Sequence, residues 1–126
     1  MMAHVHFFLN PKGGTGKSLV SYIVAQYLIS KGVKPPCIDC DPVTPTLIAY
    51  EALHAVRVNI MVENNIDKTR FDRFVELITQ GDENEHFVID NGTSSFVPLL
   101  DYMVTNAITP LLVSMGHTVT FHVIIV

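Results

Sequence analysis

The glycine-rich segment over residues 10–18 constrains the fold of this chain more than any other part of its sequence. It reads Asn-Pro-Lys-Gly-Gly-Thr-Gly-Lys-Ser and contains three of the chain's seven glycines. An apolar run over 4–9 precedes it. From residue 17 onward the apolar side chains repeat at helical spacing, as far as Lys31 and Gly32, which form a usual helix end. The pattern therefore predicts a strand, a glycine loop and a helix, in that order.

A glycine loop in this position is suited to binding phosphate. Glycines let successive backbone N–H groups point inward, and the dipole of the following helix favours an anion at its N-terminus. Lys17 would place its ammonium on the β- and γ-phosphates, and the Ser18 hydroxyl would ligate Mg²⁺. A glycine-rich surface turn with chance neighbours is the alternative. The residues predicted to bind a nucleoside triphosphate are Gly13, Gly14, Thr15, Gly16, Lys17 and Ser18.

The rest of the chain alternates between apolar strand-like segments and helical patterns. The predicted strands span 33–39, 56–62, 87–90 and 118–126. The predicted helices span 46–53, 71–78 with an end at Gly81, and 94–115. The last should break near Thr109 and Pro110, where the threonine would cap a new helix and the proline would take its first position. Strands that alternate with helices predict a mostly parallel sheet covered on both faces, in a three-layer α/β/α fold.

Composition limits the class of protein. With 126 residues and a mass of 14.0 kDa, residues 1–126 make a single domain. Hydrophobic residues make up 48% and charged residues 16%, which excludes a disordered chain. The net charge is −4 and no basic run occurs, so direct nucleic-acid binding is not expected.

Neither membrane insertion nor secretion is expected from the sequence. No apolar stretch reaches the roughly 18 residues that a transmembrane segment needs, and the first residues lack the pattern of a signal peptide. The two cysteines, Cys37 and Cys40, are expected to be small buried residues, because positions three apart on a strand face opposite sides. The six histidines show no metal-ligand motif. We expect a cytoplasmic protein.

The exact form of the loop resembles the deviant Walker A loop of the ParA/MinD family of ATPases. The general P-loop pattern has a glycine five positions before Gly16, where this chain has Pro11. A second lysine, Lys12, stands instead beside Gly13. In the family this early lysine crosses a dimer interface to reach the partner's nucleotide. The resemblance therefore implies a catalytic role for Lys12 and an ATP-dependent homodimer.

Two further segments resemble motifs of the same family. Residues 38–42, Ile-Asp-Cys-Asp-Pro, resemble its D-x-D-P switch. This implies that Asp41 positions the attacking water and that Asp39 supports the Mg²⁺ shell. Residues 87–90, Phe-Val-Ile-Asp, resemble a Walker B strand, which implies that Asp90 contacts Mg²⁺ directly or through water. Residues 91–95 depart from the commoner form of the second switch.

Three stretches together, CIDCDP, IDNGTSSFVPL and MGHTVTFHVII, resemble the TraL-type ATPases of plasmid conjugal transfer. The resemblance implies a P-loop NTPase fold, ATP as ligand or substrate, Mg²⁺ as cofactor, and conjugation machinery as a partner. Members of that family are considerably longer, and this chain stops on its last predicted strand. We therefore expect a fold that is incomplete at the C-terminus, the N-terminal part of a larger domain. The alternative is an unusually small domain whose final strand is an edge of the sheet.

Several functions remain open at this stage. The first is a Mg²⁺-dependent ATPase that hydrolyses slowly and acts as a switch. The second is a nucleotide-gated binding module without significant turnover, and the third is an inactive truncated fragment. A small-molecule kinase is the least favoured, because no basic lid segment is visible. The base preference is not determined by these residues.

Overall fold

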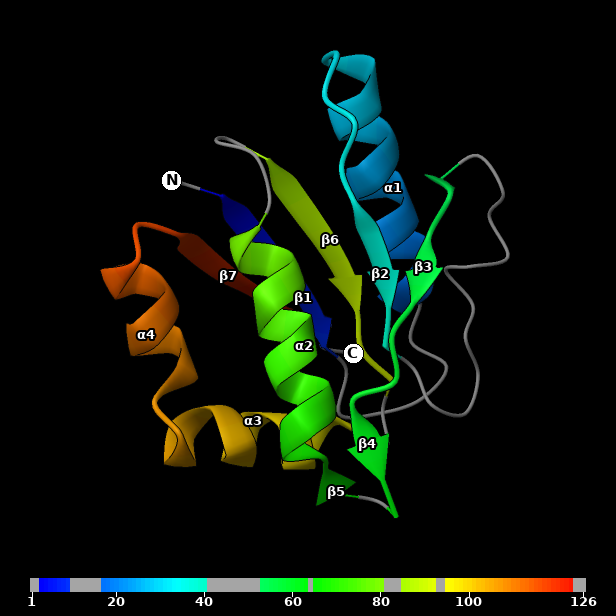
Figure 1. Cartoon of the computed structure of the whole chain (residues 1–126). Helices are drawn as coiled ribbons and strands as arrows, with labels where there is room; N and C mark the ends of the chain where they lie inside the picture. Colours follow the sequence, from blue (N-terminus) through cyan, green and yellow to red (C-terminus); the bar gives the residue numbers. More distant parts are fainter. Residues whose placement is uncertain are drawn as a thin grey trace.

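A parallel sheet of five strands forms the centre of the molecule (Figure 1). The computed structural model of the protein describes residues 3–9, 17–40, 53–63, 65–80, 85–92 and 95–123. The strand order is β3-β2-β6-β1-β7, and all four neighbouring pairs are parallel. These strands are β1 (His4–Leu9), β2 (Cys37–Asp39), β3 (Val56–Arg57), β6 (His86–Asp90) and β7 (Thr118–Val123). A separate antiparallel pair is formed by β4 (Met61–Val62) and β5 (Asn65–Ile66).

Helices cover both faces of the sheet, because side chains alternate between its faces along each strand. The helix α1 (Lys17–Ser30) packs on one face, where its apolar side chains meet Phe8, Cys37 and Val88. The opposite core combines the sheet with α2 (Lys68–Thr79), α3 (Phe96–Thr105) and α4 (Ile108–Ser114). Its buried side chains include Val5, Phe7, Ile38, Ile89, Phe71, Phe74, Ile78, Leu99, Met103 and Leu112. This confirms the predicted α/β fold with a mostly parallel sheet.

Several predicted elements are confirmed nearly to the residue. The strand over 4–9 is β1, and the helix that begins at Lys17 is followed by Gly32 in a left-handed conformation, with φ of +81°. The helical stripe over 71–78 lies in α2, and the strand over 87–90 lies in β6. The side chain of Leu77 is 43% exposed, so it lies outside the buried stripe of this helix, which consists of Phe71, Phe74 and Ile78.

Other boundaries were predicted wrongly. The strand predicted over 33–39 is shortened to Cys37–Asp39, because Pro35 and Pro36 cannot join the ladder as donors. The strand predicted over 56–62 is divided into β3 and β4. Between them the Asn59 side chain accepts a hydrogen bond from the N–H of Met61 at 3.0 Å, which competes with strand pairing.

The break in the last helical region also differs from the prediction. It falls at Asn106 and Ala107, not at Thr109 and Pro110, which lie in the first turn of α4. The Asn106 side chain donates to the carbonyl of Tyr102 at 3.0 Å and thus provides a hydrogen bond to one of the last carbonyls of α3. Ala107 then takes a left-handed conformation, with φ of +51°. Residues 46–52 of the helix predicted over 46–53 lie outside the described residues, and so do residues 124–126 of the strand predicted over 118–126.

Both cysteines are buried, as the sequence predicted. Cys37 packs in the core on the α1 face, whereas Cys40 packs in the opposite core. Burial raises the pKa of the Cys37 thiol to about 11, so it stays protonated at neutral pH. A shared metal site for the two sulfurs is therefore excluded by their positions on opposite faces.

A cluster of histidines, which the sequence analysis missed, lies on the α1 side of the sheet. We call it the histidine cluster; its members are His4, His6, His86 and His122. The ring of His6 lies between those of His86 and His122, with ring nitrogens 3.2 and 3.1 Å apart. His4 stacks on His86 at 4.4 Å between centroids. Among the described residues, no group of three histidine, cysteine or acidic side chains is placed to hold a metal ion.

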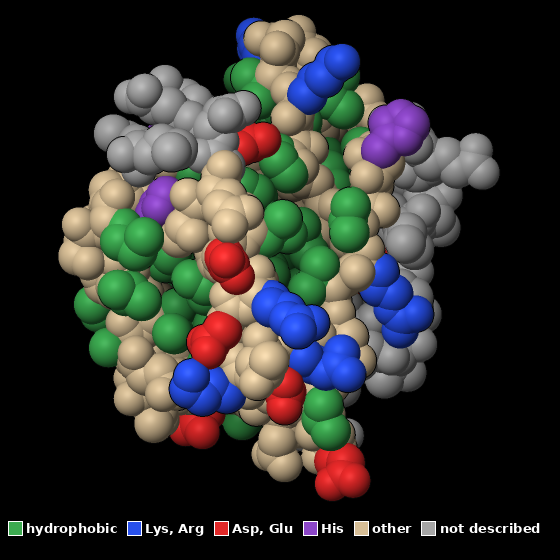
Figure 2. Space-filling view, in the orientation of Figure 1, with side chains coloured by type: hydrophobic (Ala, Val, Ile, Leu, Met, Phe, Trp, Pro, Cys, Tyr) green, Lys and Arg blue, Asp and Glu red, His purple; other side chains and the backbone are tan. Residues whose placement is uncertain are grey.

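The surface in front of α2 carries charges of both signs. Figure 2 shows acidic and basic side chains interspersed over the lower half of this face. One such pair is Lys68 and Asp72, four residues apart on α2 and 2.9 Å apart. In the described part of the chain no single helix has the length and apolar composition to cross a membrane. Among the described residues, α3 and α4 taken together have that length and composition, with a bend of 61° between them.

The start of α2 offers a test of the capping interaction. The Asp67 side chain accepts a hydrogen bond from the N–H of Arg70 at 3.0 Å and thus satisfies one free donor of the first turn. We expect Asp67→Ala to lower the free energy of unfolding by about 1 kcal/mol. Asp72→Ala, which removes only an exposed ion pair, should lower it by no more than about 0.5 kcal/mol. Urea unfolding followed by circular dichroism would measure both, and equal losses would contradict the capping role.

The histidine cluster predicts a loss of stability in acid. Burial, and then the neighbouring rings of His122, His86 and His4, lower the pKa of His6 to about 4, from 6.5. Between these two values the unfolded chain binds a proton that the folded chain does not, so the free energy of unfolding falls as the pH falls. The loss in the free energy of unfolding that His6 causes is about 1–2 kcal/mol, once solvent screening of this half-buried group is allowed for.

Urea midpoints at pH 7.5 and pH 5 would measure this loss. His6→Phe keeps an aromatic ring in the stack and removes the proton site, so it should reduce the difference between the two midpoints. His54→Asn is a suitable control, because His54 is exposed, lies outside the cluster and has a φ of +51°, which asparagine tolerates. If the difference between the two urea midpoints is the same in His6→Phe as in the wild type, His6 is not the group that destabilises the fold in acid.

Candidate functional site at the carboxyl edge of the sheet

Two buried carboxylates lie side by side where the central strands end. Asp39 is the last residue of β2 and Asp90 the last of β6, and the two are paired in register. Both residues are 0% exposed. Cys37 and Val88, two positions earlier on the same strands, pack under α1. Alternation therefore places Asp39 and Asp90 on the α1 face, at the edge where parallel α/β sheets bind ligands.

Backbone hydrogen bonds hold this edge together. The N–H of Cys40 donates to the carbonyl of Asp90 at 2.8 Å, and the N–H of Val58 donates to the carbonyl of Asp39 at 3.0 Å. The N–H of Asn91 donates to the carbonyl of Phe8 at 3.1 Å. The ends of β1, β2, β3 and β6 are thus tied to one another, and the two carboxylates rest on a rigid support.

The helix α1 begins beside this edge. Figure 1 shows its N-terminal end near the side of the sheet to which the arrowheads of β2 and β6 point. Lys17 and Ser18 are the first two residues of α1, and the structure describes their backbone but not their side chains. Lys12, the loop residues Gly13–Gly16 and Asp41 also lie outside the described residues. The structure therefore brings together Asp39, Asp90 and the start of α1.

The two carboxylates at this edge are suited to binding a cation. In general, two adjacent carboxylates repel each other when both are ionised, and a cation bound between them offsets that repulsion. Carboxylate oxygens are the protein ligands that Mg²⁺ prefers, and Mg²⁺ is usually held by one or two of them together with phosphates and water. The residues present therefore fit a Mg²⁺ ion, with Asp39 and Asp90 as the groups that would hold it.

Asn91 is a candidate site residue that the sequence analysis missed. It follows Asp90 directly and is 0% exposed. Within the described part of the chain, neither its Oδ1 nor its Nδ2 atom has a hydrogen-bond partner. Buried amide groups are nearly always paired in native proteins, so an unpaired one needs an explanation. Burial and pairing could not be seen in the sequence, where residues 91–95 stood out only as a departure from a motif.

The turn that follows Asn91 is closed by a serine. The Ser95 hydroxyl donates to the carbonyl of Gly92 at 2.8 Å, and the N–H of Ser95 donates to the same oxygen at 3.1 Å. Ser95 is fully buried at the start of α3. Its hydroxyl is thus engaged in holding the turn between β6 and α3, and it is not presented as a nucleophile.

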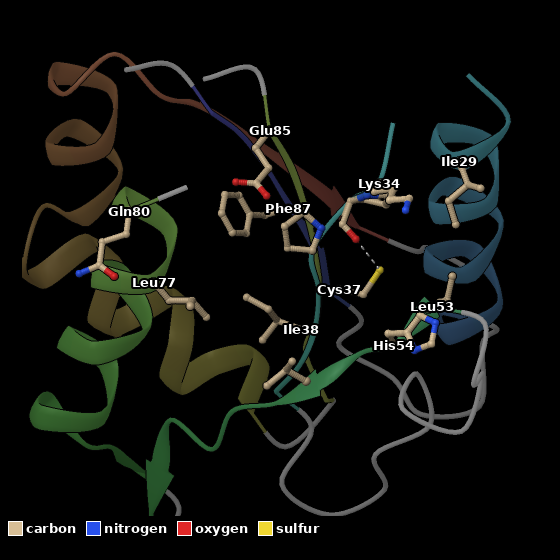
Figure 3. Close-up of a pocket in the computed structure, with 13 residues that line it drawn as sticks. Ile29, Lys34, Cys37, Ile38, Leu53, His54, Leu77, Gln80, Glu85 and Phe87 are labelled. Carbon is tan, nitrogen blue, oxygen red and sulfur yellow. Dashed lines mark hydrogen bonds between the residues drawn. The ribbon is translucent and has the colours of Figure 1, made fainter. Parts of the chain in front are cut away.

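A cavity of about 800 Å³ lies elsewhere, at the amino ends of β2 and β6. Figure 3 shows Ile29 of α1 and Leu77 of α2 on its two sides, with Ile38 and Phe87 of the sheet between them. Neither Asp39 nor Asp90 lines it. Its wall is mostly apolar, so it lacks the array of donors that a phosphate needs. This cavity is therefore separate from the edge at which Asp39 and Asp90 lie.

Comparison with known proteins shows similarity to two curated proteins that share a name. No protein-family model matches the chain, and no solved structure matches it. Over 124 residues the chain is 46% identical to a curated protein of Escherichia coli named Protein TraL, and 44% identical to a second protein of the same name and organism. Each alignment covers 98% of this chain and 51% of the relative. The chain is thus homologous to TraL and spans about half the length of these relatives.

Proposed function

We propose that this protein is a Mg²⁺-dependent switch of the ParA/MinD type, with a P-loop NTPase fold, which binds ATP, hydrolyses it slowly and serves plasmid conjugal transfer. One observation carries the proposal. Asp39 and Asp90 are buried side by side at the carboxyl edge of a parallel sheet, on the face covered by α1. The helix α1 starts within the segment Lys-Gly-Gly-Thr-Gly-Lys-Ser over 12–18. The helix that follows the glycine-rich segment in the sequence thus begins near the edge at which the two carboxylates lie, and this arrangement supports the proposal.

The binding half of the proposal assigns a role to each residue. The loop over 13–16 would surround the phosphates with backbone N–H groups, and Lys17 would contact the β- and γ-phosphates. Ser18, Asp39 and Asp90 would hold Mg²⁺, which when bound neutralises charge on the phosphates. The N-terminal dipole of α1 would add a further favourable interaction with the anion.

The turnover half of the proposal depends on two other residues. Asp41 would orient the attacking water, since phosphoryl transfer needs an oriented nucleophile and charge neutralisation more than a strong base. Lys12 would reach the nucleotide of a second copy, so that ATP would promote a homodimer. Slow hydrolysis would then act as a timer on that dimer and on its contact with the transfer machinery in the cytoplasm. Homology to TraL supports the link to conjugal transfer.

Calorimetric titration tests the binding half. We expect Mg²⁺-ATP to bind the wild-type chain saturably, and Lys17→Ala to weaken this binding by at least about tenfold, because it removes a charge-assisted contact to phosphate. Asp90→Asn should weaken the dependence of binding on Mg²⁺. Asp101→Asn serves as the matched control, because Asp101 is exposed on α3. Unchanged affinity in Lys17→Ala would show that the glycine loop does not bind phosphate.

Phosphate release tests the turnover half. Asp41→Ala should abolish release and keep nucleotide binding, because it removes only the group that orients water. Lys12→Ala should reduce turnover and also abolish the ATP-dependent dimer in size-exclusion chromatography. If the wild-type chain binds ATP without releasing phosphate, the protein is a nucleotide-gated binding module. If the chain does not bind ATP at all, it is an inactive fragment under these conditions.

A further inference from the structure

The cavity at the amino ends of β2 and β6 has the size and the wall of a small-molecule site. Its volume of about 800 Å³ falls within the range of about 300–1,000 Å³ that is typical of such sites. Ile29 of α1 and Leu77 of α2 lie on its two sides, with Ile38 and Phe87 of the sheet between them (Figure 3). A mostly apolar hollow of this size suits a ligand with an apolar body.

Several large apolar side chains of this wall are open to solvent. Ile29 is 38% exposed, Leu77 is 43% exposed and Val56 is 57% exposed. These three residues come from α1, α2 and β3, and all of them line the same cavity. Single apolar side chains scattered over a surface are normal, whereas several that converge on one hollow indicate a binding surface. A ligand in the cavity would remove this apolar surface from water.

The backbone beside the cavity disfavours a peptide strand as the ligand. The edge strand β3 has only two residues and pairs with the last two residues of β2. The carbonyl of Pro36 accepts from the N–H of Val88 on β6, so alternation turns Pro35 toward the β3 side. Pro35 has no N–H to donate, and its carbonyl already accepts from the Cys37 thiol at 3.4 Å. An added strand would therefore find few hydrogen bonds here, which favours a ligand that side chains bind.

A lysine at the cavity indicates the charge of the ligand's polar end. Both Lys34 and Glu85 line the cavity. Glu85 has an interaction of its own within the protein, whereas Lys34 forms no ion pair with any residue that the structure describes. In Figure 3 Lys34 lies on the side of the cavity toward α1, and Glu85 lies on the side toward α2. An ammonium group without a partner, beside an apolar wall, favours a ligand that carries a carboxylate.

We propose that this cavity binds a small apolar carboxylate, with its hydrocarbon part between Ile29 and Leu77 and its carboxylate beside Lys34. The site is separate from the proposed nucleotide site, because β2 has the cavity at its amino end and Asp39 at its carboxyl end. The inference therefore does not rest on nucleotide binding, and its test needs no nucleotide.

Dye displacement tests the class of ligand. We expect anilinonaphthalene sulfonate, a fluorescent apolar anion, to bind the wild-type chain saturably, and decanoate to displace it. Decanol, the same hydrocarbon chain without the charge, should need an about fivefold higher concentration. Lys34→Met should remove this preference, because it keeps an apolar stem and removes the ammonium group. Equal displacement by decanoate and decanol in the wild type would overturn the assigned class.

Substitutions in the wall test the place of binding. Leu77→Glu puts a negative charge on the apolar wall and should weaken the binding of decanoate at least about tenfold. Leu111→Glu is the matched control, because Leu111 is 47% exposed on α4 and does not line the cavity. It should keep the wild-type affinity. Val56→Glu, on β3, and its control Val113→Glu, 55% exposed on α4, should repeat this contrast.

Far-ultraviolet circular dichroism shows which of the four variants are folded, and two independent pairs keep the test valid if one variant unfolds. If the wild-type chain binds no decanoate saturably, the cavity is not a site for an apolar carboxylate. Equal losses in the wall variants and their controls would place the binding elsewhere on the protein and would overturn the inference as well.

Discussion

The register between β2 and β6 is the constraint on which the candidate site depends. Because the strands are parallel and paired in register, their last residues are neighbours on the same face, and these residues are Asp39 and Asp90. A shift of one residue in either strand would turn one carboxylate into the opposite core. The hydrophobic pattern prevents that shift, since Ile38 and Ile89 would then leave the core that they share with α2, α3 and α4.

The same alternation gives the two faces of the sheet different roles. The face toward α2, α3 and α4 carries most of the large buried side chains and supplies most of the apolar burial. The α1 face carries a smaller core, the two carboxylates and the histidine cluster. The two carboxylates and the histidine cluster therefore share one face, and the other face is mostly apolar core.

Much of the fold could be predicted because local signals agree with one another. The apolar run of β1, the helical period in α2, and glycine at the end of α1 each reflect a local preference. The predictions failed where a side chain competes with the backbone. Asn59 bonds the amide of Met61 and divides a predicted strand, and Asn106 ends α3 before the expected cap at Thr109. Such competition depends on neighbours in space, which periodicity does not report.

By itself the sequence determined the α/β class, the order of the first elements, the burial of both cysteines on opposite faces, and the candidate residues Asp39 and Asp90. These follow from spacing along the chain, because alternation and helical period are local properties. Only the tertiary structure decided which strands are neighbours. The order β3-β2-β6-β1-β7 sets Asp39 beside Asp90, gathers histidines from three strands, and buries the Asn91 carboxamide. Contacts between segments 50 or more residues apart, such as Asp39 and Asp90, arise from packing of the whole chain, and no local pattern encodes them.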